Sequence, residues 1–176
     1  MEGNRLKKPQ RTAFTMRPIG IIHTEASSDE VRKGSREIRS TIEVYPKYRQ
    51  GLNGIDGYSH LFVLCYLNQL RREQMGVLHV RPRRFLRDGL PLKKLPLVGV
   101  FALNSPSRPN PIGITTAKVL GRRGRRIFVK GLDYFDQTPV LDIKPYHPHY
   151  RVRTIGYPDW VSRLEKKVKS RKTRAK

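Results

Sequence analysis

The sequence predicts a mainly β protein, a small antiparallel β-barrel with a C-terminal helix and basic tails. Short segments rich in β-branched and aromatic residues recur at intervals of about ten residues, with Gly, Pro, Asn and Asp between them. Amphipathic helical segments are absent between these candidate strands, which argues against a parallel, doubly wound sheet. The 176 residues are enough for one domain with a hydrophobic core.

Seven or eight strands account for this pattern, and the first is expected over residues 14–23. Residues 41–45 alternate apolar and polar side chains, as a half-buried strand does. One helical turn is expected at 47–50. The nearly continuous apolar run at 61–67 predicts a central strand, and residues 77–80 predict a short one.

Two further strands, 99–103 and 114–120, flank a segment that has three prolines within six positions. Because proline lacks an amide donor, fixes φ and favours an extended predecessor, this segment is predicted to be a rigid loop. The basic sequence 121–126 is expected to form a hairpin turn into a strand at 127–130. Residues 140–143 are the last predicted strand.

One longer helix is expected at the C-terminus. Pro158 and Asp159 provide a helix start signal, and the following apolar side chains fall on one face: Trp160, Val161, Leu164 and Val168. Residues 1–11 are polar and basic, which is typical of a disordered tail. The expected organisation is thus a basic disordered tail at 1–11, a β-barrel domain at 12–156, and a helix with a basic tail at 157–176.

The charge of the chain indicates the class of partner. The net charge is +23, from 37 lysines and arginines against 14 aspartates and glutamates, and residues 12–162 retain +13 of it. Because the excess is not confined to the tails, we expect a polyanionic partner, and nucleic acid is the leading class. A purely colloidal role for the charge is the alternative.

Several other classes of protein are not indicated. Cys65 is the only cysteine, so an internal disulfide and a cysteine-based zinc site are excluded. His147 and His149 lack further ligands at a recognisable spacing, so no metal is predicted. Apolar stretches of membrane-spanning length and a secretory signal are absent, which favours a cytoplasmic protein with no membrane partner.

Two polar segments are the candidate functional sites. The first is the proline-rich loop 99–113, which holds Asn104, Ser105, Ser107, Arg108 and Asn110; its alternative is a simple connector across one end of the barrel. The second, 133–146, carries Asp133, Asp136 and Asp142 in an acid-poor chain. The turn at 136–139 either caps its own backbone or presents polar groups to a small molecule. Asp142 and Lys144 share a strand face and are expected to form an ion pair.

These segments resemble the TsaA-like family, also called TrmO. The matching sequences are residues 19–22, 57–61, 99–113 and 136–146, in the family's order, and the resemblance covers about 16–148. It implies a small β-barrel that is unlike the Rossmann methyltransferases and uses S-adenosylmethionine. Characterised members methylate the exocyclic amino nitrogen of threonylcarbamoyl-adenosine next to the tRNA anticodon.

By matching position, the resemblance implies that the cofactor is bound by Asn68, Gln69, Asn104, Ile114, Asp136, Gln137, Thr138 and Pro139, with an upstream contribution from around Arg32 and Lys33. The family's usual loop arginine is replaced by Asn104, and Arg108 is expected to compensate for it. A lost charge-assisted hydrogen bond costs roughly 1.5–3 kcal/mol. Asp136 is the one candidate catalytic base, although the carbamoylated amino group is acidic enough to need little help.

The resemblance also implies an RNA partner, the anticodon stem-loop of tRNA, and a homodimer. We expect phosphate contacts from the C-terminal tail and from Arg83, Arg84, Arg87, Arg122, Arg123, Arg125 and Arg126. Tyr146 or Tyr150 is expected to stack on a splayed base. Two alternatives remain open: a non-catalytic RNA-binding barrel that has lost its cofactor, and a methyltransferase with a different RNA substrate.

Overall fold

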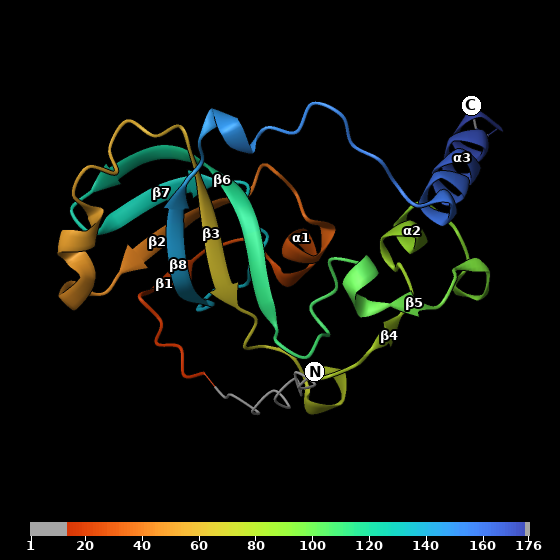
Figure 1. The fold of residues 1–176 in the computed structure, drawn as a ribbon, viewed down its shortest axis with the longest axis horizontal. Coiled ribbons are helices and arrows are strands. Elements are labelled where there is room, and N and C mark those ends of the chain that lie inside the picture. Colours follow the sequence, from red (N-terminus) through yellow and green to blue (C-terminus); the bar gives the residue numbers. More distant parts are fainter. Residues whose placement is uncertain (1–13, 175–176) are drawn as a thin grey trace, which may run out of the picture.

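A closed antiparallel barrel forms the centre of the computed structural model, which describes residues 14–174 (Figure 1). Its strands follow one another around the barrel in the order β1-β2-β7-β6-β3-β8. They are β1 (Gly20–His23), β2 (Arg39–Val44), β3 (His60–Tyr66), β6 (Ile112–Arg123), β7 (Arg126–Lys130) and β8 (Pro139–Pro145). Closure leaves no unpaired sheet edge. The predicted fold class is confirmed, and the predicted tail at 1–11 lies outside the described residues.

Strand β3 is hydrogen-bonded on both sides. It pairs with β6 from His60↔Lys118 to Tyr66↔Ile112, and with β8 from Leu61↔Pro145 to Cys65↔Val140. Its alternate residues Leu61, Val63 and Cys65 are fully buried and point into the barrel. The central position predicted from the apolar run is therefore confirmed.

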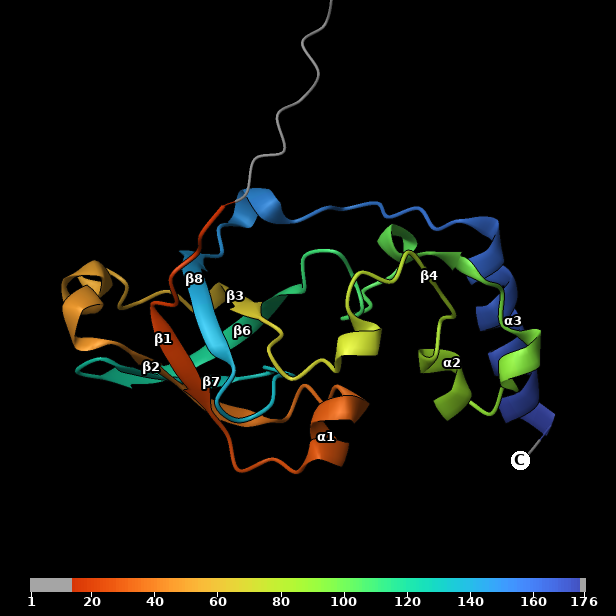
Figure 2. The ribbon, with the colours of Figure 1, turned by 90° about the horizontal axis from the view of Figure 1, so that it is seen from below.

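A second group of elements lies beside the barrel in both views (Figures 1 and 2). It contains β4 (His79–Val80), α2 (Arg84–Arg87), β5 (Val98–Gly99) and α3 (Asp159–Arg174). We call residues 79–99 and 159–174 the helical unit. Its own core consists of Phe85, Leu90, Leu95, Leu164 and Val168, with Trp160 packed against it. The predicted C-terminal helix is thus confirmed, and its apolar face packs on a segment that we had placed in the barrel domain.

Some predicted strands are shorter or absent in the structure. The first strand begins at Gly20 instead of residue 14, and Pro18 just before it cannot donate to a ladder. The predicted strand at 99–103 is wrong beyond Gly99, because residues Val100–Ala102 form a 3-10 turn, η4. Val100 is buried there whereas Phe101 is 79% exposed. The hairpin after β6 is also tighter than predicted, since the strand continues to Arg123.

Two short helices were not predicted. Helix α1 (Ser28–Lys33) begins at a capping box between Ser27 and Glu30 and ends at Gly34, whose φ is 65°. This signal is present in the sequence. Helix α2 has only four residues. The remaining short elements are 3-10 turns: η1 (Pro46–Leu52), which includes the predicted helical turn, η2 (Arg72–Gln74), η3 (Leu92–Lys94) and η5 (Pro148–Tyr150).

None of the helices in the described part of the chain is long and apolar enough to cross a bilayer.

Gly113 is expected to be essential to the packing where β6 begins. A Cβ at this position would lie 2.7 Å from ring atoms of Tyr134 and 3.1 Å from a methyl group of Leu67. Tyr134 is buried, so its ring has little space to move. Gly113→Ala should lower the free energy of unfolding by about 1–3 kcal/mol, the usual penalty of overpacking, measured by urea denaturation.

Gly51→Ala is the matched control, because nothing lies within 4 Å of the added Cβ. Equal unfolding midpoints for the two variants would contradict this packing.

Candidate functional site

One end of the barrel gathers the two segments that the sequence singled out. The end of β3 and the start of β6 are neighbours, and Leu67 N donates to Pro111 O over 2.8 Å. The start of β8 adjoins the same end of β3, with Cys65 opposite Val140. The last residues of the proline-rich loop 99–113, the pair Asn68–Gln69 and the turn 136–139 therefore meet at one rim, which we call the site end.

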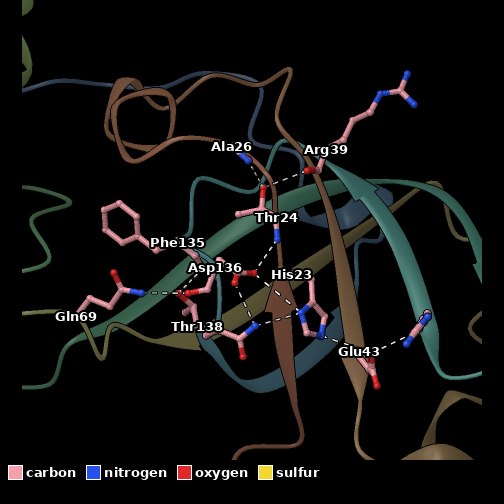
Figure 3. Close-up of polar contacts among 11 residues, drawn as sticks. His23, Thr24, Ala26, Arg39, Glu43, Gln69, Phe135, Asp136 and Thr138 are labelled. Atoms are coloured by element: carbon pink, nitrogen blue, oxygen red, sulfur yellow. Dashed lines mark hydrogen bonds and ion pairs between the residues drawn. The ribbon is translucent and has the colours of Figure 1, made fainter.

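Hydrogen bonds tie the turn 136–139 to its neighbours (Figure 3). The Asp136 carboxylate accepts from the amide of Thr24 (3.0 Å) and from Gln137 Nε2 (3.1 Å). Gln69 Nε2 donates to the carbonyl oxygen of Asp136 over 3.0 Å. Thr138 Oγ1 donates to Phe135 O over 2.8 Å, as expected for a turn that caps its own backbone. The turn is thus anchored both to the end of β1 and to the end of β3.

Gln137 carries local backbone strain at this position. Its φ is 61°, and among the described residues no other non-glycine residue has a positive φ. Its amide donates to Ile22 O over 2.9 Å, and its side chain lies 3.3 Å from His23 Nδ1. Strained residues that persist only because their surroundings hold them are concentrated at functional sites.

A chain of charged groups runs from the turn along the outside of the barrel. His23 Nδ1 lies 4.0 Å from Asp136, and His23 Nε2 lies 3.5 Å from Glu43. Glu43 also pairs with Arg125 (2.7 Å) and Arg126 (3.0 Å). Burial would raise the pKa of Glu43, but these two guanidinium groups bring that pKa below its ordinary value.

The Asp136 carboxyl is also shifted towards its charged form. Burial would raise its pKa, but hydrogen bonds from Thr24 and Gln137 and the charge of His23 bring that pKa below its ordinary value. The group is therefore ionised at neutral pH and is a weak base. This suits a residue that attracts a cation better than one that removes a proton.

Arg108 stabilises the proline-rich loop by hydrogen bonds to carbonyl oxygens of the same loop. Its Nε donates to Ser105 O over 2.8 Å, and its Nη2 donates to Leu103 O over 2.6 Å and to Val100 O over 3.5 Å. The guanidinium is thus occupied by its own loop, whereas Asn104 is exposed at the surface. We infer that Arg108 sets the shape in which the loop presents Asn104.

Other predicted cofactor residues also lie at the site end. Ile114 is near the start of β6 and is 63% exposed, and Pro139 begins β8. His23 and Thr24, which the sequence did not indicate, join them from the end of β1. Arg32 of α1, in the segment where the resemblance implies an upstream contribution, lies 5.5 Å from the centre of the Phe135 ring. Barrel closure brings these residues to the rim, and no local pattern predicts it.

The predicted RNA contacts do not form one cluster. Arg83, Arg84 and Arg87 are in the helical unit, and Arg84 pairs with Glu165 over 3.3 Å. The hairpin arginines lie at the opposite end of the barrel, where carboxylates of Asp56 and Glu43 pair with Arg122, Arg125 and Arg126. Arg123 has no ion pair among the described residues.

Tyr146, the predicted stacking residue, is also far from the rim, at the end of β8 where its backbone bonds to His60. Its ring centroid lies 5.1 Å from that of Phe62 and 6.0 Å from that of Tyr150. The expected ion pair between Lys144 and Asp142 forms on this strand at 2.9 Å.

A solvent-open cavity of about 520 Å³ lies between α1 and the start of β2. Its lining includes Glu25, Glu30, Lys33, Glu37 and Arg39, so of the predicted cofactor segments only the upstream one, at Lys33, contributes to it.

Comparison with known proteins identifies the family. The sequence model of the tRNA-methyltransferase O N-terminal domain matches residues 27–151. A probable S-adenosyl-L-methionine-binding protein of Pyrococcus abyssi is 35% identical over 86% of this chain and 77% of its own length. Another, of Methanothermobacter thermautotrophicus, is 37% identical over 75% of this chain and 89% of its own length.

The crystal structure of TrmO from Pseudomonas aeruginosa has a similar fold, with a TM-score of 0.64 and 27% identity over 84% of this chain. The chain spans 63% of the length of that solved protein. The matched domain covers the barrel strands from β2 to β8 and the rim that they form. The chain belongs to the tRNA-methyltransferase O (TrmO) family.

Proposed function

We propose that this protein transfers a methyl group from S-adenosylmethionine to a nitrogen of tRNA. The acceptor that we propose is the exocyclic amino nitrogen of threonylcarbamoyl-adenosine next to the anticodon. The observation that supports this most is the meeting of the turn 136–139, Gln69 and the proline-rich loop at one rim. Relatives that are named as S-adenosyl-L-methionine-binding proteins add support.

The residues at the rim fit such a cofactor. S-adenosylmethionine supplies a methyl group that its positive sulfonium activates. The ionised, half-exposed Asp136 places a negative charge at the rim, which favours a cationic ligand. Asn104 offers a neutral amide, and the exposed side chain of Ile114 offers apolar surface. The negative charge, the amide and the apolar surface of the rim thus complement the sulfonium, the polar groups and the apolar surface of S-adenosylmethionine.

Catalysis in this site rests on alignment. The loop is stiffened by its prolines and by Arg108, and the turn is fixed by Thr24 and Gln69, so the rim loses little freedom when it binds. No residue at the rim is assigned as a strong base, because Asp136 is weakly basic. The proton of the acceptor nitrogen passes to water or to the carboxylate of the substrate itself.

The tRNA partner is supported by the net charge of +23 and by the family. We further propose a cytoplasmic location, and a homodimer, which the family resemblance implies. A second candidate function is RNA binding without methyl transfer, which the replacement of the family's usual arginine by Asn104 favours.

The direct test is methyl transfer by purified protein from labelled S-adenosylmethionine to bulk tRNA, followed by nucleoside mass spectrometry. Label in methylated threonylcarbamoyl-adenosine is the expected result. Label in another nucleoside would show that the proposed acceptor is wrong and would identify the actual one. Tight tRNA binding without any calorimetric response to millimolar S-adenosylmethionine would leave only the second candidate.

Asp136→Asn is expected to weaken binding of S-adenosylmethionine about tenfold, because it removes the charge that faces the sulfonium. The amide oxygen of the new side chain can still accept from Thr24, so the turn keeps its anchor. Titration calorimetry should show an unchanged affinity for S-adenosylhomocysteine, which has no charge on sulfur. An equal loss for both ligands would mean that Asp136 acts only through the shape of the turn.

Arg108→Ala should loosen the loop, since three carbonyl oxygens lose their donor. We expect a loss of about 1–2 kcal/mol in the free energy of unfolding and faster hydrogen exchange across residues 99–113. Arg108→Lys distinguishes two roles, because lysine keeps the charge but not the planar fork. If the loop needs the planar fork, Arg108→Lys will lose as much stability as Arg108→Ala. If Arg108 neutralises a ligand carboxylate, Arg108→Lys will keep the cofactor affinity that Arg108→Ala loses.

A further inference from the structure

The helical unit carries a positive charge that the candidate methyl-transfer site does not explain. Residues 79–99 and 159–174 contain thirteen lysines and arginines against three carboxylates. Helix α3 also lies outside the region that matches the family, which ends at residue 151. A function inherited with the matched domain therefore does not account for this helix.

Helix α3 is held firmly against the rest of the unit. Val161, Leu164 and Val168 are buried on one side of it. On its flank, Glu165 pairs with Arg84 over 3.3 Å, and Arg171 Nη1 donates to Gly89 O over 2.5 Å. The apolar face is thus used inside the protein, which leaves no apolar face for insertion into a lipid headgroup layer.

The opposite side of α3 presents four exposed cations: Arg163, Lys166, Lys167 and Lys169. None of the four has an ion pair among the described residues. Their spacing makes several of them neighbours on the helix surface, as with Lys166 and Lys169 or Arg163 and Lys167, and such like-charged pairs destabilise a helix. The helix dipole favours cations only in the last turn, so it does not compensate these residues. A bound polyanion would relieve their repulsion.

The chain's path joins the helical unit to the site end. It leaves the barrel at the end of β3 and returns at the start of β6, and both points belong to the rim. Residues 79–99 of the helical unit are inserted between these two points, and α3 packs on them at the side away from the barrel (Figures 1 and 2). A polyanion bound on the exposed side of α3 is therefore held on a unit that is joined to the rim through residues 79–99 and the proline-rich loop.

We propose that the exposed side of α3 is an RNA docking surface that binds the phosphate backbone of the substrate at a distance from the site end. The cations are arranged along one rigid helix with about 5–6 Å between neighbouring side-chain origins, which suits a run of phosphates. This proposal rests on the proposed function for its choice of RNA as the polyanion.

The test compares Lys166→Gln/Lys169→Gln with Lys47→Gln/Lys118→Gln, a control that removes the same charge from exposed lysines on the barrel. The probe is a fluorescently labelled tRNA anticodon stem-loop, and its affinity is measured by anisotropy between 50 and 250 mM salt, roughly the range over which counterion release is read. All variants alter exposed side chains, and circular dichroism checks their folding.

The α3 variant is expected to bind the stem-loop about tenfold more weakly at 100 mM salt. Its plot of log affinity against log salt concentration is expected to have a slope that is smaller in magnitude by about two. The control should match the wild type. Equal losses in both variants, or a loss in neither, would overturn the proposal. So would a loss of binding to phosphatidylserine vesicles with RNA binding intact.

Binding of S-adenosylmethionine, measured by calorimetry on the same samples, separates this proposal from the proposed function. Absence of cofactor binding in the wild type would refute methyl transfer and leave the result for α3 unaffected. Normal cofactor binding in the α3 variant, together with weaker RNA binding, assigns the defect to docking.

Discussion

The pairing of β3 with both β6 and β8 is the constraint on which the rest of this structure depends. It requires an uninterrupted apolar segment, and Leu61, Val63 and Cys65 provide one that fills the barrel interior. Because the partners are antiparallel to β3, the end of β3 meets the starts of β6 and β8. Segments more than twenty residues apart, at 68–69, 99–113 and 136–139, thus reach the same rim. The candidate site is a direct consequence of barrel closure.

Polar interactions then determine what that rim can bind. Thr24 and Gln69 hold the turn from two sides, and their hydrogen bonds help to offset the strain of the positive φ at Gln137. Hydrogen bonds from Thr24 and Gln137 to the carboxylate keep Asp136 ionised. The proline-rich loop is rigid for a different reason. Its prolines restrict the backbone, and Arg108 donates hydrogen bonds to its carbonyl oxygens. A charged turn and a stiff loop make the site end a preorganised rim, which suits the alignment of a reactive ligand better than acid-base chemistry.

The sequence predicted what short-range patterns encode. Strands β2, β3 and β7 were found because their alternation or continuous apolarity follows from burial on the barrel interior. The turn at Asp136 was recognised by its residue types. Long-range pairing was not predictable, so Thr24 and His23 were missed at the site. The apolar face of α3 was visible, but its partners Phe85, Leu90 and Leu95 were not. Ser27 and Glu30 did signal α1, and that signal was overlooked.

The central claim is that the rim formed by β3, β6 and β8 binds the cofactor. Amide chemical shifts of the whole protein, recorded by NMR during titration with S-adenosylhomocysteine, test it most directly. We expect the largest shifts in residues 66–69, 104–114 and 136–139. Shifts concentrated at the cavity between α1 and β2, around Glu25 and Glu37, with an unchanged rim would contradict the account.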